Sequence, residues 1–311
     1  MLKKIDLKKQ KKFTEKLSAN SIFFILPVLF LLVVITGLFF YYQSRRLAEV
    51  GDDYIVTTAP SDVTQANVLG VKTSLTPTQT ISIRVPIFLY HYVENVKNTN
   101  DKGRISLNIP PNILIAQIET LKSAGYSFIT PNDLTDALTG KKKLSQKSVM
   151  ITFDDGYMDF YTDVFPILKK EQVKGVAYIV PNFLDRPNYM FSLQLREIAK
   201  SPLVEIGAHT MNHVWLQGVA KEKVQYEIAQ SRKTLQDMLH LAVNSFAYPY
   251  GAFDQQAIQL VKDAGFTNAV STLPGIVHTQ NVAYFLYRLR PGYRTGPGLI
   301  NYLAQDTFKP W

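Results

Sequence analysis

Short apolar runs alternate with amphipathic stretches from about residue 84 to the end of this 311-residue chain. The runs have the length of strands buried on both faces, whereas the stretches between them repeat their apolar residues with the helical period. The pattern predicts strands at 86–90, 127–129, 149–153, 175–180, 204–208, 245–248 and 268–271. It predicts helices at 112–124, 131–138, 161–171, 192–200, 221–239 and 255–264. Strands that alternate with helices indicate a parallel sheet, and seven strands are one fewer than a complete barrel needs, so we expect an α/β fold, a distorted and incomplete (β/α) barrel.

The N-terminal part of the chain has a different pattern. Residues 1–20 contain seven lysines and only two acidic residues, and the uncharged stretch that follows, 21–42, is long enough to cross a bilayer as a helix. Lysines that precede such a helix stay in the cytoplasm under the positive-inside rule. We therefore predict a cytoplasmic basic tail at 1–20, a single transmembrane anchor at 21–42, an extracellular tether at 43–83 and one α/β domain at 84–311.

A cleaved secretory signal is the alternative for the apolar segment. Signal peptides have a shorter apolar region and a cleavage site made of small residues. Here Tyr41, Tyr42, Arg45 and Arg46 close the segment instead. The sequence therefore favours a retained anchor in the cell membrane, with the domain on the outside of the cell.

Charge and cysteine content exclude several classes of function. The formal net charge is +9, but a good part of the excess lies in the first twenty residues, where it serves membrane topology and attraction to anionic lipids. The domain shows no basic face interleaved with aromatic residues, so we expect no nucleic-acid partner. The chain contains no cysteine, so any metal must be held by histidine and carboxylate. Nothing in the sequence indicates an oligomeric state.

Two groups of polar residues follow predicted strands. Asp154 and Asp155 come directly after the strand at 149–153, and His209 and His213 follow the strand at 204–208. Barrel active sites are built at the carboxyl ends of the strands. One aspartate with two histidines is a set of three ligands that leaves metal positions open for water and substrate. The pattern therefore indicates a metal-dependent hydrolase, in which one carboxylate binds the metal and the other binds a proton.

These motifs resemble those of a known enzyme family. Residues 152–156 (Thr-Phe-Asp-Asp-Gly), 209–213 (His-Thr-Met-Asn-His) and 248–251 (Tyr-Pro-Tyr-Gly) occur in the order and rough spacing of the polysaccharide deacetylases, carbohydrate esterase family 4. The opening stretch 85–92 looks like the first strand of the biofilm branch, the poly-N-acetylglucosamine deacetylases. The resemblance covers about residue 84 to the C-terminus. It implies a distorted barrel, a zinc-like divalent metal and removal of N-acetyl groups from a glycan.

The resemblance also implies roles for the two motifs that follow strands. Asp155, His209 and His213 would be the metal ligands, and Asp154 would be the general base. Zn²⁺ is the expected ion, with Co²⁺, Ni²⁺ and Mn²⁺ as alternatives.

The third motif would serve the substrate. The backbone N–H of Tyr250 would be an oxyanion donor beside the metal. Tyr248, Pro249 and Tyr250 would form an aromatic wall, which suits a sugar.

Two departures from the family pattern concern the neighbourhood of these residues. Members commonly carry an arginine that tunes the base carboxylate, but the aligned position here is Ala247. The later Asp-and-Trp motif is missing, since the only tryptophans are Trp215 and Trp311. The biofilm branch also lacks that arginine, so the resemblance places the chain there. Another residue must therefore set the pKa of Asp154. The side of the substrate groove that the Asp-and-Trp motif usually forms must also come from other residues.

The general acid has two candidates. His278 is the only histidine near the C-terminus, where the family usually places this residue, although its surroundings do not match the family pattern. His91 follows the first predicted strand and would lie on the same face of the barrel. The sequence does not decide between them.

The sequence thus favours a membrane-anchored hydrolase that removes N-acetyl groups from an extracellular N-acetylglucosamine polymer, either poly-N-acetylglucosamine or peptidoglycan. An O-acetyl polysaccharide esterase would use the same residues. A catalytically silent glycan-binding barrel is a third interpretation, against which the intact set of metal ligands argues.

Overall fold

The computed structural model describes residues 81–98 and 100–310. The expected cytoplasmic tail, the transmembrane anchor and nearly all of the tether lie outside these residues. Within the part that is described, no helix combines the length and hydropathy that a membrane span requires.

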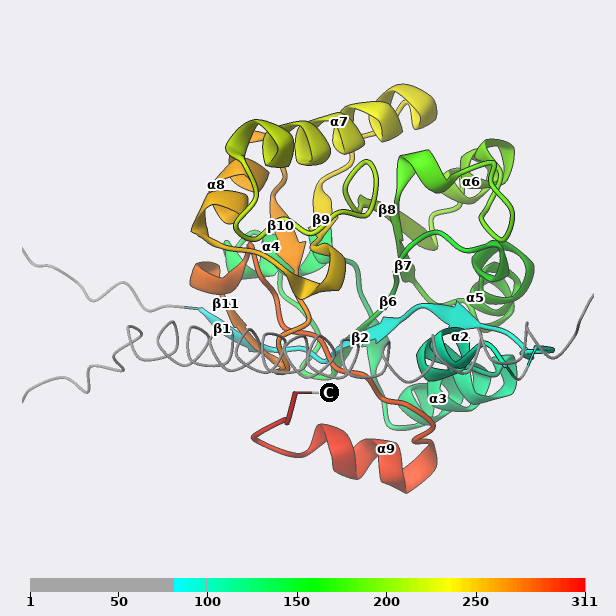
Figure 1. Cartoon of the computed structure of the whole chain (residues 1–311). Helices are drawn as coiled ribbons and strands as arrows, with labels where there is room; N and C mark the ends of the chain where they lie inside the picture. Colours follow the sequence, from blue (N-terminus) through cyan, green and yellow to red (C-terminus); the bar gives the residue numbers. More distant parts are fainter. Residues whose placement is uncertain (1–80, 99, 311) are drawn as a thin grey trace, which may run out of the picture. The chain divides into compact units, whose positions relative to one another are not determined.

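The seven predicted strands form one curved sheet in which every pair is parallel (Figure 1). The α/β class predicted from the alternation of strands and helices is therefore confirmed. In pairing order the strands are β10 (Asn268–Val270), β9 (Ser245–Ala247), β8 (Val204–Ala208), β7 (Gly175–Ile179), β6 (Ser148–Phe153) and β2 (Ile87–Tyr90), and β5 (Ser127–Phe128) pairs with the start of β6.

The predicted helices connect these strands, and most of them lie around the outside of the sheet (Figure 1). The helices are α3 (Pro111–Ser123), α4 (Pro131–Leu138), α5 (Phe165–Glu171), α6 (Ser192–Ala199), α7 (Lys221–Leu239) and α8 (Gln255–Asp263). Local chemistry sets where helices begin: Thr130 and Asp133 form a reciprocal capping box on α4, and Asp254 caps α8 by accepting from the Ala257 N–H at 2.9 Å.

Alternating residues of the strands fill two separate cores, as the period of a strand requires. The outer core lies between the sheet and the helices and includes Phe88, Ile151 and Phe246. The inner core fills the curved sheet itself, where Ile87, Met150 and Tyr178 pack with leucines of α4. Continuing the alternation of β6 beyond Met150 puts Thr152 and Asp154 on the inner face as well.

Residues 286–289 connect the two edges of the sheet. Leu286 pairs in parallel with Val270 at the end of β10, and Leu289 pairs in parallel with Phe88 of β2. The Leu289 N–H donates to the Ile87 carbonyl at 2.8 Å. This segment thus closes the barrel that the seven predicted strands leave incomplete, and the sequence pattern did not predict it.

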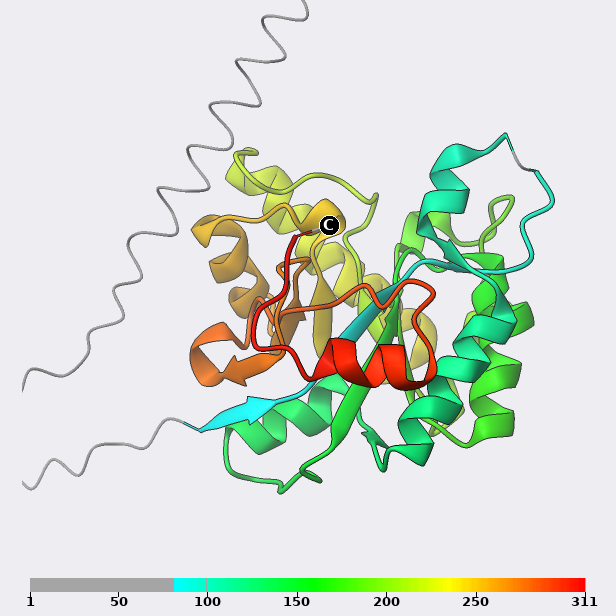
Figure 2. The same ribbon diagram turned by 90° about the horizontal axis from the view of Figure 1, so that it is seen from below.

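Further short elements lie beside the barrel. Two small sheets flank the barrel, β1 (Ser82–Arg84) with β11 (Val277–Thr279) antiparallel and β3 (Tyr92–Val93) with β4 (Asn108–Ile109) parallel. Two further helices are α2 (Lys102–Leu107) and α9 (Gly296–Leu303), and α9 packs against α3 (Figure 2). These elements are short, so they contain too few residues to show a period.

Candidate active site

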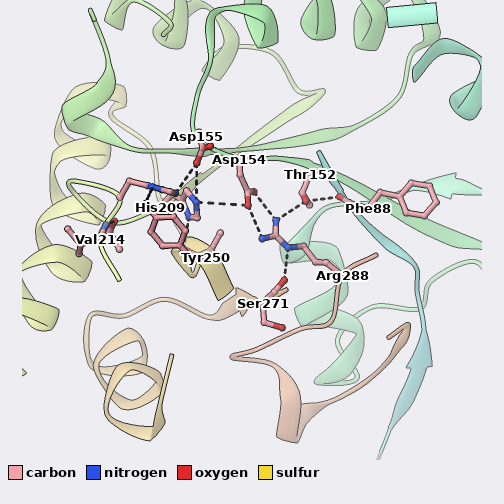
Figure 3. A network of polar contacts seen from close by, with 12 residues as sticks. Phe88, Thr152, Asp154, Asp155, His209, Val214, Tyr250, Ser271 and Arg288 are labelled. Atoms are coloured by element: carbon pink, nitrogen blue, oxygen red, sulfur yellow. Dashed lines mark hydrogen bonds and ion pairs between the residues drawn. The ribbon is translucent and has the colours of Figure 1, made fainter. Parts of the chain in front are cut away.

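The candidate site lies at the carboxyl ends of β6 and β8, which flank β7 in the sheet, and Figure 3 shows its side chains. Asp154 and Asp155 directly follow β6, and His209 directly follows β8. Backbone hydrogen bonds continue past the strand ends and fix both positions: the Asp154 N–H donates to the Tyr90 carbonyl at 3.0 Å, and the His209 N–H donates to the Ile179 carbonyl at 2.9 Å. The sheet therefore brings together side chains that are more than fifty residues apart in the sequence.

Asp155, His209 and His213 form a compact group of possible ligands. The Nε2 atoms of His209 and His213 lie 3.3 and 3.2 Å from Asp155 Oδ1, and one ligand atom from each residue lies within 4.8 Å of the others. Ligand atoms around a tetrahedral zinc ion are themselves about 3.3–3.6 Å apart. The spacing of these atoms therefore suits a divalent metal.

The hydrogen bonds of the group also indicate a metal site. His209 Nδ1 lies 2.7 Å from the Ala247 carbonyl oxygen, which can only accept, so Nδ1 carries a proton and the neutral ring presents a lone pair at Nε2. Asp155 Oδ1 is buried and has no partner with hydrogen-bond geometry among the described residues. Lone pairs thus face each other across about 3.3 Å. A cation or an added proton must lie between them, and the three donors fit a metal ion.

The pKa shifts of these groups reflect the same crowding of lone pairs. Burial raises the pKa of Asp155, but the two imidazoles outweigh burial and hold that pKa well below its usual range. Burial lowers the pKa of His209, but Asp155 and Asp154 together raise it above its ordinary value. Asp155 is thus an anion, as a metal ligand needs to be.

Asp154 is held by Arg288, a residue that the sequence analysis missed. The guanidinium donates to both carboxylate oxygens, Nη1 to Oδ1 and Nη2 to Oδ2, at 2.8 Å each (Figure 3). Burial raises the pKa of Asp154, but the charge and hydrogen bonds of Arg288, together with the charges of His209 and His91, outweigh burial and lower the pKa below its ordinary value. Asp154 Oδ2 also lies 4.0 Å from His209 Nε2, so an ionised carboxylate stands directly beside the ligand group.

Arg288 is itself fixed in the barrel interior. It is fully buried, and its Nε donates to the Ser271 carbonyl at 2.7 Å. Its Nη1 also donates to Thr152 Oγ1 at 3.1 Å, and that hydroxyl donates in turn to the Phe88 carbonyl at 2.7 Å. Arg288 comes from the closing segment 286–289, so the segment that completes the barrel also supplies the cation for Asp154.

The loop that carries His209 and His213 is tied to α7 by Glu227. This buried carboxylate accepts from the Asn212 backbone N–H at 2.9 Å and from the Asn212 side-chain amide at 2.8 Å. The Glu227 backbone carbonyl accepts from the Met211 N–H at 3.1 Å. Three hydrogen bonds donated to one helix residue therefore hold Met211 and Asn212, the two residues that precede His213.

Left-handed backbone conformations cluster at the site. Asp155, Thr210, His213 and Tyr250 have φ values of 77°, 58°, 55° and 60°. Such conformations are unfavourable for residues other than glycine and persist where the surroundings enforce them, often at functional sites. The backbone of the turns after β6, β8 and β9 therefore takes conformations that place these side chains at the site, and not the conformations that these residue types prefer.

Comparison with known proteins accounts for this arrangement. A family model described as polysaccharide deacetylase matches residues 141–269. A protein of Bacillus subtilis (strain 168), YxkH, whose name also places it among the polysaccharide deacetylases, is 30% identical over 207 residues. The match covers 67% of this chain and 71% of YxkH. The chain belongs to the polysaccharide deacetylase family.

Two further similarities bear on this deacetylase. A poly-beta-1,6-N-acetyl-D-glucosamine N-deacetylase of Escherichia coli (strain K12) is 27% identical over 202 residues, which are 51% of this chain and 30% of that enzyme. The solved structure of the Streptococcus pyogenes deacetylase PplD in complex with acetate has a TM-score of 0.66 at 24% identity, covering 73% of this chain and all of that one. PplD shows that the fold is shared. Family membership makes the chain a hydrolase of carbon–nitrogen bonds other than peptide bonds, as predicted.

Arg288 explains one departure of this deacetylase from the family pattern. The position where members commonly carry an arginine is Ala247, which is fully buried in the inner core. The positive charge that an arginine at this position would supply comes instead from Arg288, in the segment 286–289. An arginine between apolar residues of the short run 285–289 is the signal that sequence reasoning overlooked.

The third motif is only partly as predicted. Tyr250 is 62% exposed, and its hydroxyl lies 3.0 Å from His213 Nδ1, so its side chain does border the site. Tyr248 and Pro249 are buried. The Tyr248 hydroxyl donates to the Tyr284 carbonyl at 2.9 Å, and its ring packs on Phe253 in the outer core. The prediction that Tyr248 and Pro249 line a wall for sugar is therefore wrong, because the strand alternation turns Tyr248 away from the site.

His91 lies at the carboxyl end of β2, beside the end of β6. Burial lowers the pKa of His91, while the charges of Asp155 and Asp154 raise it in part and those of Arg290 and Arg288 lower it. Its surroundings thus place His91 among the charged groups of the site. Its role as general acid stays a prediction.

His278 is not brought to the site. It lies in β11, fully buried, with Nε2 at 2.9 Å from the Val85 carbonyl oxygen. Val85 precedes Tyr90 by five residues, which is about 16 Å along a strand, so His278 stands near the opposite end of the barrel. Burial lowers the pKa of His278 to about 4. The position contradicts the prediction that His278 protonates the leaving amine, because β11 pairs with β1, which precedes the amino end of β2, and not with a strand that ends at the site.

Proposed function

We propose that this polysaccharide deacetylase removes N-acetyl groups from an extracellular polymer of N-acetylglucosamine. Poly-N-acetylglucosamine is the first candidate substrate and peptidoglycan the second. The observation that carries the proposal is the pair of adjacent carboxylates with different partners: Asp155 faces two imidazoles, and Asp154 is held by Arg288. The name of the Escherichia coli relative supports the first substrate.

Amide hydrolysis needs an activated water, stabilisation of the oxyanion and a proton for the leaving amine. Asp155, His209 and His213 would hold a divalent ion. Zn²⁺ is the first candidate, and Co²⁺, Ni²⁺ and Mn²⁺ are alternatives. When bound, such an ion polarises the carbonyl and lowers the pKa of water. The enzyme is thus proposed to depend on the metal, with ligands that contain no thiolate.

Asp154 is suited to accept the proton of the attacking water. Arg288 favours its ionised form, yet each carboxylate oxygen has a second lone pair beyond the one that Arg288 occupies. Asp154 Oδ2 is the oxygen nearest the ligand group, 4.0 Å from His209 Nε2, so the proton would arrive there. Positioned proton transfer of this kind contributes about 10²–10⁴-fold in rate.

The other two roles fall to residues that border the same group. The backbone N–H of Tyr250 is proposed to stabilise the oxyanion, since Tyr250 is fixed beside His213 in a left-handed turn. His91 is proposed to protonate the leaving amine, because it is the candidate histidine that lies among the charges of the site.

The proposed location is the outer face of the cell membrane, with the chain held by a helix at 21–42. The lysines of residues 1–20 and the uncharged stretch that follows support this topology. The placement lets the domain reach a polymer outside the cell.

Acetate release tests the proposed function directly. The purified full-length chain, loaded with Zn²⁺, would be incubated with poly-N-acetylglucosamine, peptidoglycan, chitin oligomers and acetylxylan. We expect acetate from at least one of the first two and loss of release in Asp154→Asn. Release from acetylxylan alone would assign an O-acetyl esterase, and no release from any polymer would favour a glycan-binding barrel.

A further inference from the structure

Trp215 and Tyr250 lie side by side at the surface, next to the metal-ligand candidates. Their ring centroids are 6.1 Å apart and their planes are inclined by 30°. The two rings are stacked with an offset and overlap only in part. Trp215 is 48% exposed and Tyr250 is 62% exposed. We call this pair the aromatic platform.

The platform is anchored to the site through His213. The Tyr250 ring lies 4.6 Å from the imidazole, and its hydroxyl lies 3.0 Å from Nδ1. Trp215 follows His213 by two residues, so both members of the platform are fixed by the turn that supplies a ligand. A molecule on the platform would therefore be held at a defined distance from the reacting group.

The tyrosines elsewhere around the site do not offer such faces. Tyr157 is stacked between Tyr92, at 3.8 Å, and Tyr189, at 5.0 Å, and the guanidinium of Arg104 lies 4.4 Å over the Tyr92 ring. Rings covered in this way present edges and hydroxyl groups only. Open aromatic faces beside the ligand group are thus found at Trp215 and Tyr250.

We infer that the aromatic platform binds a pyranose ring of the polymer, next to the sugar that loses its acetyl group. This inference rests on the proposed function. One face of a pyranose carries C–H groups and is apolar, and it packs on an exposed aromatic ring, whereas its hydroxyl groups remain in water. The platform also supplies the wall that the missing Asp-and-Trp motif would otherwise form.

The contribution of Trp215 is to binding rather than to the chemical step. Trp215→Ala should raise KM for a pentamer of β-1,6-linked N-acetylglucosamine about tenfold, which corresponds to about 1.4 kcal/mol, with kcat unchanged within about twofold. Hydrolysis of 4-nitrophenyl acetate, which has no neighbouring sugar, should keep its kcat/KM. Trp215→Phe should recover most of the affinity. Tyr226→Ala is the matched control, since Tyr226 is 55% exposed on α7.

A binding measurement separates this inference from the proposed function. The chain has two tryptophans, so Trp311→Phe leaves Trp215 as the only fluorescent indole. Titration of that variant with the pentamer should change its emission in a saturable way, whether or not acetate is released. Absence of acetate with saturable quenching would overturn the proposed function and keep the platform. Acetate release with an unchanged KM in Trp215→Ala, or with no change in emission, would overturn the platform and keep the function.

Discussion

The guanidinium of Arg288 holds both oxygens of Asp154 at 2.8 Å, in a geometry that no substitution by lysine can reproduce. The two residues are 134 positions apart. Both are buried, and Arg288 is the largest of the influences that keep the carboxylate ionised against burial.

Truncation of Arg288 should therefore damage both stability and turnover. In Arg288→Ala the buried carboxylate loses its counter-charge, and removal of one partner of a buried ion pair costs about 3–5 kcal/mol of unfolding free energy. The pKa of Asp154 should rise, and turnover at pH 7 should fall at least about 100-fold. Urea unfolding and acetate release measure the two effects.

Two companion variants test whether the charge or its position matters. Arg288→Lys keeps the charge and should lose less stability than Arg288→Ala. Ala247→Arg combined with Arg288→Ala moves the cation to the family's usual position. Equal turnover in wild type and Arg288→Ala would contradict the role of Arg288.

Removal of any one of the proposed ligands should abolish metal retention. Asp155→Ala, His209→Ala and His213→Ala each leave two donors. The loss of metal affinity should exceed the roughly 10–100-fold that is lost when a residue that only holds a ligand in place is changed. Metal content after dialysis is the measurement. Asp154→Asn serves as the control, because it should keep the metal and lose turnover. Stoichiometric metal in dialysed His209→Ala would remove the ligand assignment.

Glu227 should act on the metal through the turn that it holds. Glu227→Ala frees the Asn212 N–H and side-chain amide, so metal affinity should fall about tenfold, and Glu227→Gln, which keeps one acceptor, should lie between that variant and wild type. Competition with a chelator measures the affinity. Glu222→Ala, an exposed acidic residue on the same helix, controls for charge. A lower thermal midpoint with unchanged metal affinity would make Glu227 purely structural.

His278 should affect stability in acid but not catalysis. Below pH 6.5 the unfolded chain binds a proton on His278 that the folded chain does not bind until the pH nears 4. Protonation therefore favours unfolding, and wild type should lose about 3 kcal/mol from this residue between pH 6.5 and 4. His278→Gln should lose less over the same window in urea unfolding. Its acetate release at pH 7 should match wild type, whereas that of His91→Ala should not.

The topology prediction concerns the chain before the domain. A protease added outside intact cells should remove the domain after residue 46 and leave the N-terminus protected, because the proposed topology keeps the lysines of residues 1–20 in the cytoplasm. Immunoblots against tags at either end show which part survives. Recovery of the full-length chain, or of a soluble form cleaved near residue 42, would argue against the anchor.

The sheet and the grouping of Asp155, His209 and His213 follow from patterns that a sequence carries. Apolar runs predict strands, and parallel strands end at one edge, so residues placed after strands meet there. Arg288 was not predictable in this way, since its segment reaches the site by pairing with Phe88 and Val270, which are far from it in the sequence. His278 was misplaced because nothing in a three-residue strand indicates its direction.

The left-handed turns at Asp155, Thr210 and His213 have a consequence for engineering. Glycine would relax such backbones by about 1 kcal/mol or more, but at Asp155 and His213 it would delete a proposed ligand. Gln172 and His240 hold the same conformation, at φ 54° each, as the C-caps of α5 and α7. Glycine suits helix ends of this kind. Gln172→Gly and His240→Gly should therefore raise thermal stability without changing a residue of the proposed active site.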